Sequence, residues 1–86
     1  MKIKDVFEIE RIDDKQFMVC LDNSIFAGMV ELNETADFIV ECLKEDISVE
    51  EIAKRMSSEY EATVEEVLSG VEQIVNQLRN INAIEE

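Results

Sequence analysis

The side chains that could do chemistry in this sequence are almost all carboxylates. The chain has 21 Asp and Glu against 8 Lys and Arg, and it has no histidine. Because histidine is the usual general base and the commonest metal ligand, its absence removes two frequent routes to catalysis. The adjacent pairs Glu50–Glu51 and Glu65–Glu66 remain as candidate acid–base groups. Each pair follows a Ser or Thr at the spacing of a helix start, so helix capping accounts for both pairs.

Other kinds of reactive site lack their residues. Cys20 and Cys42 are too few and too far apart for a zinc site or a redox pair, and we expect two small buried thiols. The two glycines, Gly28 and Gly70, stand alone, so the sequence contains no phosphate-cradling loop. The acidic residues show no spacing that supports a metal site. We therefore expect a non-catalytic protein that needs neither a metal nor a cofactor.

The charge of the chain restricts its partners. A formal net charge of −13 repels phosphate backbones and anionic membrane surfaces and favours partners with basic segments. No apolar run approaches the roughly 20 residues of a membrane span. The first residues, "MKIKDVFEIER", alternate charged with apolar side chains, unlike a secretory signal. A cytoplasmic protein that binds neither nucleic acid nor membrane is the expectation.

The first third of the chain shows the two-residue period of β-strands. Strands are predicted at residues 6–12, 16–21 and 25–32, within a single domain that spans residues 1–86. The short turns between them predict an antiparallel three-stranded meander. The residues expected to share a face are Phe7 and Ile9 on the first strand, and Phe17, Val19 and Leu21 on the second.

The remaining two-thirds shows helical periodicity in three segments. Asn33 or Thr35 is the expected N-cap of the first helix. The second and third helices begin with predicted capping boxes, formed by Ser48 with Glu51 and by Thr63 with Glu66. Three strands followed by three helices, of which the third is the longest, predict an α+β fold of winged-helix-like form.

A helix-turn-helix arrangement raises the possibility of DNA binding. The first turns of a recognition helix read bases with Arg, Lys, Asn or Gln. In this chain those turns carry Glu65 and Glu66, and no basic residue lies between Thr63 and Leu78. DNA binding is therefore not expected.

The order of motifs in the second half resembles the PqqD-like family. "ELNETADFIVECL" is followed by an acidic loop and "SVEEIAKRM", then by "SEYEATVEEVLSGVEQIVNQL" and the apolar end "NINAI". The family comprises the pyrroloquinoline quinone biosynthesis protein D and related recognition elements for ribosomally made, modified peptides. The resemblance covers roughly residues 17–84. Where many relatives have glycine before the terminal apolar residues, this chain has Asn82, which also adopts a left-handed conformation.

The resemblance implies an adaptor that binds the leader segment of a precursor peptide and presents the peptide to a maturation enzyme. In pyrroloquinoline quinone synthesis that enzyme is a radical S-adenosylmethionine protein. In the family, the leader is held as an added strand against the third strand, beside the third helix. The peptide-binding residues that this mode implies are Ile25, Phe26, Ala27, Gly28, Met29, Val30 and Glu31 on the strand, and Val64, Leu68 and Val75 on the third helix.

Two alternatives stay open at this point. Gly28 either lets a second backbone approach the strand or marks a bulge at a strand edge. The apolar residues of the third helix divide between core and groove, with Val67, Val71, Ile74 and Leu78 expected in the core. A winged-helix protein-interaction or regulatory module without DNA contact is the alternative function. The open strand edge could also pair with a second copy of the chain.

Overall fold

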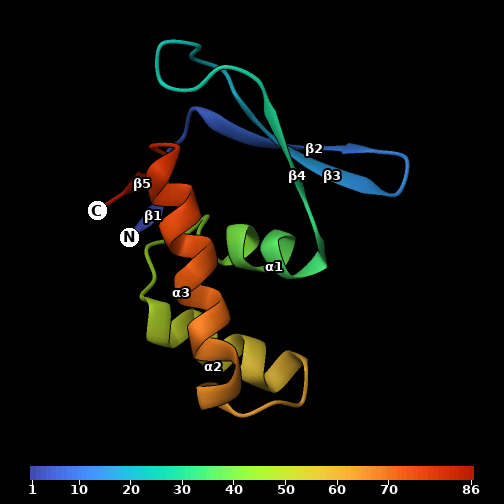
Figure 1. Cartoon of the computed structure of the whole chain (residues 1–86), viewed down its shortest axis with the longest axis vertical. Helices are drawn as coiled ribbons and strands as arrows, with labels where there is room; N and C mark the ends of the chain where they lie inside the picture. Colours follow the sequence, from blue (N-terminus) through green and yellow to red (C-terminus); the bar gives the residue numbers. More distant parts are fainter.

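The computed structural model describes residues 1–86, in which three helices lie on one side of a three-stranded sheet (Figure 1). The predicted α+β fold, with an antiparallel meander before three helices, is confirmed, and the third helix is the longest. The sheet has the strand order β2-β3-β4. The elements are β2 (Phe7–Ile12), β3 (Lys15–Cys20), β4 (Met29–Leu32), α1 (Glu34–Cys42), α2 (Val49–Glu59) and α3 (Val64–Asn80).

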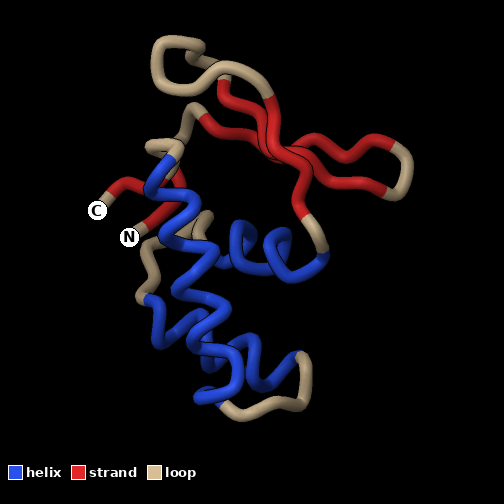
Figure 2. The backbone as a smooth tube through the Cα atoms, viewed as in Figure 1, coloured by secondary structure: helices blue, strands red, loops and turns tan.

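A second, two-stranded sheet joins the two ends of the chain (Figure 2). It pairs β1 (Lys2–Ile3) with β5 (Ile84–Glu85) in antiparallel register, and it was not expected. Two residues are too few to display a two-residue period, so only the fold reveals these strands. Asn82, two residues before the start of β5, has a φ of 65°, which confirms the left-handed conformation expected there.

The third strand is shorter than predicted. β4 begins at Met29, and residues 22–28 form a loop instead of the expected strand start. The carboxylate of Asp22 accepts hydrogen bonds from the amide and the hydroxyl of Ser24, at 3.0 and 2.6 Å, and so closes a tight turn. The side chain of Phe26 still packs on the core, with its ring 6.4 Å from that of Phe7. The apolar residues of this segment therefore cover one end of the sheet as a loop.

The buried face of the sheet is the one that carries Phe7 and Ile9. Their cross-strand partners are Cys20 and Met18, and both of these side chains are buried. The face that Phe17, Val19 and Leu21 share therefore points away from the helices, and Leu21 is 64% exposed. Hydrophobicity alone did not indicate which face of β3 enters the core, because both faces carry apolar residues.

Helix starts follow the predicted capping chemistry, with one difference. Asn33 caps α1 by accepting from the amide of Ala36 at 2.8 Å, and Ser48 forms a reciprocal capping box with Glu51. Thr63 accepts from the amide of Glu66 at 3.1 Å, and no return bond from the Glu66 side chain accompanies it. The second predicted capping box is therefore a single N-cap bond. None of the three helices combines the length and apolar character that crossing a membrane requires.

Candidate functional site

The orientation of the main-chain groups on β4 follows from the pairing of β2 with β3. In an antiparallel ladder, pairs that exchange two hydrogen bonds alternate with pairs that exchange none. The Leu21 amide donates to the Val6 carbonyl at 2.8 Å, so Val6 and Leu21 form a hydrogen-bonded pair. The next pair along the ladder, Phe7 with Cys20, therefore exchanges no hydrogen bond. Main-chain groups of even-numbered residues of β3, such as Met18, therefore point toward β4.

This alternation leaves one edge of β4 open. Val30 and Leu32 pair with even-numbered residues of β3, so their amides and carbonyls are directed into the sheet. Met29 and Glu31 direct theirs to the opposite side, where no strand lies. The edge thus offers two donors and two acceptors to an additional strand.

An apolar groove of about 220 Å³ runs beside this edge, between β4, α1 and the C-terminal half of α3. Val30 and Ala36 are half-buried in its wall, while Leu32, Val40 and Leu78 form a buried floor. Glu31 is the only charged residue that lines it. A strand added to the edge would place alternate side chains over this groove. The full lining is Val30, Glu31, Leu32, Asn33, Ala36, Val40, Ile74, Gln77, Leu78 and Ile81.

The structure reassigns the apolar positions of α3. Val75, expected in the groove, is completely buried in the core, and Ile74, expected in the core, lines the groove. Val64 and Leu68 are half-buried near the N-terminal end of α3, which lies beside α2 and away from β4 (Figure 1). The seven-residue spacing of Val67, Ile74 and Ile81 was the available signal for a second apolar stripe. These last three residues are all half-buried.

Among the strand residues predicted to bind peptide, Val30 and Glu31 line the groove and Met29 lies on the open edge. Ile25 and Phe26 pack on the core from the loop before β4. Ala27 and Gly28 are exposed in that loop. Gly28 has a φ of 109°, and a β-carbon there would meet no atom within 4 Å. Residues with a side chain rarely adopt this backbone conformation, so the turn itself gives a local reason for glycine at position 28. Gly28 therefore lies neither in a bulge nor inside a strand.

The opposite edge of the sheet is less accessible to a strand. A second apolar hollow of about 270 Å³ lies between β2 and α1. Arg11 on β2 donates to Asp37 and Glu41 on α1, at 3.4 and 3.0 Å, and these ion pairs tie β2 to α1. The amide of Phe7 is also already bonded to the carbonyl of Lys4 at 3.0 Å. No ion pair joins β4 to α3, so the groove beside β4 is the better candidate.

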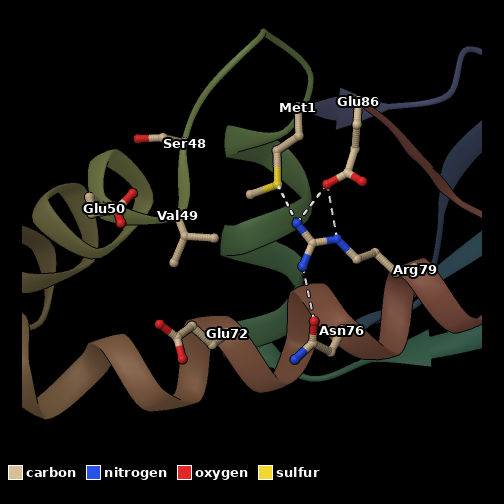
Figure 3. A pocket seen from close by; sticks show the side chains of 8 residues that line it. All are labelled: Met1, Ser48, Val49, Glu50, Glu72, Asn76, Arg79 and Glu86. Atoms are coloured by element: carbon tan, nitrogen blue, oxygen red, sulfur yellow. Dashed lines mark hydrogen bonds and ion pairs between the residues drawn. The ribbon is translucent and has the colours of Figure 1, made fainter.

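The largest hollow, of about 550 Å³, lies near the joined chain ends and is polar (Figure 3). Its one cation, Arg79, donates to Glu86 at 3.0 and 2.6 Å and to Asn76 at 3.0 Å. Glu50 and Glu72 also line the hollow. Because Arg79 is already paired and the other charges are negative, this hollow offers no free positive charge to an anionic ligand.

Sequence comparison identifies the family. The family described as "Coenzyme PQQ synthesis protein D (PqqD)" matches residues 18–84, which is well over half of the chain. The chain belongs to the PqqD family. A solved structure, TbiB1 in complex with the TbiA(beta) leader peptide, matches this PqqD-family fold with a TM-score of 0.80 and 25% sequence identity. The match covers 99% of this chain and 95% of that chain. No curated protein matches the sequence.

The cysteines of this PqqD-family chain are placed as structural groups. Both are buried, and burial raises the pKa of the Cys42 thiol above its ordinary value. A thiol with a raised pKa is protonated at neutral pH and is a poor nucleophile. No group of three or more Cys, Asp or Glu side chains is placed to hold a metal ion.

The start of α3 bears on nucleic-acid binding by the PqqD-family chain. Glu65 and Glu66 are exposed in its first turn, where base-reading side chains would lie. We expect a fluorescence-polarisation titration with duplex DNA at moderate salt to show no specific binding. Sequence-specific binding tighter than about micromolar would contradict this electrostatic argument.

Proposed function

We propose that this chain binds the leader segment of a ribosomally made precursor peptide as an added strand on β4 and presents the peptide to a maturation enzyme. The open edge supplies main-chain bonds through Met29 and Glu31, and these bonds are independent of the leader sequence. The apolar groove supplies selectivity, because side chains on the inner face of the added strand enter it. The observation that carries the proposal is the coincidence of this open edge with an apolar groove beside α3.

The comparison with TbiB1 supports the same role, since that fold is solved with a leader peptide bound. The adaptor itself performs no chemistry in this proposal, and the maturation enzyme supplies it. That enzyme is of the radical S-adenosylmethionine class if this chain follows the synthesis of pyrroloquinoline quinone. A second copy pairing through β4 would occupy the same edge and would compete with the leader.

Amide hydrogen exchange with and without the cognate leader tests the proposal. The amides of Met29 and Glu31 point away from β3, so in the free protein they lack a strand partner. We expect the leader to slow their exchange by about tenfold or more, because each gains a strand hydrogen bond. Val30 and Leu32 already donate within the sheet and serve as internal controls for general stabilisation.

The β2 edge of the sheet is where a result that contradicts the proposal would appear. By the same alternation, Ile9 and Arg11 direct their amides away from β3 at the β2 edge. Leader-dependent protection at these two residues, with none at Met29 and Glu31, would place the peptide on the wrong side of the sheet for this proposal.

A further inference from the structure

The outer face of the sheet carries apolar side chains on which no helix packs. Phe17 and Val19 lie half-buried at the centre of this face, and Met29 beside them is 57% exposed. None of the three belongs to the apolar residues that pack on the core. The helices lie on the other side of the sheet (Figure 1). An antiparallel sheet with one solvated face normally alternates apolar inside with polar outside, so this face departs from the pattern.

Acidic residues border these apolar side chains. In the strand register, Glu8 lies opposite Val19, and Glu10 and Glu31 lie on either side of Phe17. All three glutamates are exposed. Lys15, at the hairpin end of β3, lies on the same face and is the one cation beside them. The outer face is thus an apolar centre whose rim is mainly negative. We define the outer-face patch as Phe17, Val19 and Met29 with Glu8, Glu10 and Glu31.

We propose that the outer-face patch docks a protein surface with an apolar centre and a rim of Lys and Arg, and that this surface belongs to the maturation enzyme. The charge selects the partner. A second copy would bring the three glutamates against their own counterparts, in addition to the repulsion between chains of net charge −13. A basic rim removes that repulsion and steers association. The choice of the enzyme as partner rests on the proposed function.

The position of the patch suits that partner. Met29 and Glu31 belong both to the patch and to the open edge of β4, so a leader strand added there would extend the same outer face. An enzyme seated on the patch would therefore lie next to the bound leader. Apart from Glu31, which borders both, the patch and the groove lie on opposite faces of the sheet, so both can be filled together.

The test measures binding of the whole chain to its purified maturation enzyme, with the cognate leader present at saturation. Val19→Lys places a charge at the centre of the outer face and leaves the groove and the β4 edge unaltered. We expect binding of the enzyme to weaken by about tenfold or more, as for a central interface residue. Leader affinity should stay within about twofold of wild type, because Val19 lies outside the groove. Tyr60→Lys, at a 39% exposed residue after α2, is the matched control and should change neither affinity.

A charge-reversal variant keeps the test independent of any loss of stability in Val19→Lys. Glu10→Lys removes no apolar contact, and it should lower the association rate and weaken the salt dependence of enzyme binding. Unchanged enzyme binding by both variants would overturn the proposal, as would a wild-type chain that does not bind the enzyme. The proposal would also be overturned if Val19→Lys lost leader affinity and enzyme affinity to the same extent, because the leader and the enzyme would then share one binding surface. The proposed function is tested separately, by amide hydrogen exchange with the leader alone and no enzyme. If the leader does not protect Met29 and Glu31 there, the proposed function is contradicted, whatever the enzyme binding shows.

Discussion

Glu31→Pro is expected to weaken leader binding by about 10- to 100-fold while the sheet stays folded. Proline has no amide hydrogen, and the amide of Glu31 points to the open edge, where proline is tolerated in a sheet. The leader carbonyl that this amide would bond is then left without a partner. An unsatisfied group of this kind costs about 1–3 kcal/mol, which corresponds to the stated loss of affinity. Calorimetric titration with the leader measures the effect.

Two variants separate the lost hydrogen bond from other causes. Glu31→Thr removes the same carboxylate and keeps the amide hydrogen, so its leader affinity should remain near that of wild type. Val30→Pro removes an amide that bonds to β3 and should lower the melting temperature strongly. Equal leader affinity for Glu31→Pro and Glu31→Thr, with both proteins folded, would exclude strand addition at β4.

Ile74→Ala and Val75→Ala, at adjacent positions of α3, are expected to affect different properties: the first leader affinity and the second the stability of the fold. Ile74 is half-buried in the wall of the groove, and its truncation removes about three methylene-sized groups that a leader side chain would contact. At about 0.8 kcal/mol for each such group buried, leader affinity should fall by about tenfold or more. Calorimetric titration measures this loss, and a thermal melt measures separately the stability lost because Ile74 also packs against the core.

Val75→Ala should instead lower stability. Val75 is completely buried, so its truncation leaves a cavity in the core and should cost about 2 kcal/mol of folding free energy. The folded fraction should bind the leader with wild-type affinity, because Val75 does not line the groove. A Val75→Ala protein with wild-type stability and weakened leader binding would restore the assignment that periodicity alone suggested.

The sequence by itself determined the features that depend on neighbouring residues. Hydroxyl and amide side chains three residues ahead of their partners located the starts of α1, α2 and α3, because capping is a contact within one turn. The alternation at Phe7 and Ile9 indicated a half-buried strand. The absence of histidine and the net charge of −13 narrowed the possible activities before any fold was known. The ordered motifs around Leu32–Asn33 indicated the family, to which the chain belongs.

Only the tertiary structure decided what depends on contacts between distant residues. The exchange of roles between Ile74 and Val75 follows from the way α3 crosses α2 along one half and faces β4 along the other. Ile74 and Val75 are consecutive residues on α3, and both belong to its broad apolar stripe. Sequence periodicity therefore does not show which of the two faces the core and which faces the groove. Which face of β3 is buried depends on the position of the helices, because Phe17 and Val19 are as apolar as Met18 and Cys20.

The open edge of β4 is likewise a property of the assembled sheet. A strand's own residues do not indicate how many neighbours it has, so the direction of the Met29 and Glu31 amides became known only from the register with β3. The pairing of β1 with β5 brings together residues from the two ends of the chain, and no local pattern marks it. Local chemistry therefore specified the elements of this protein, and long-range packing decided which of their surfaces remain free for partners.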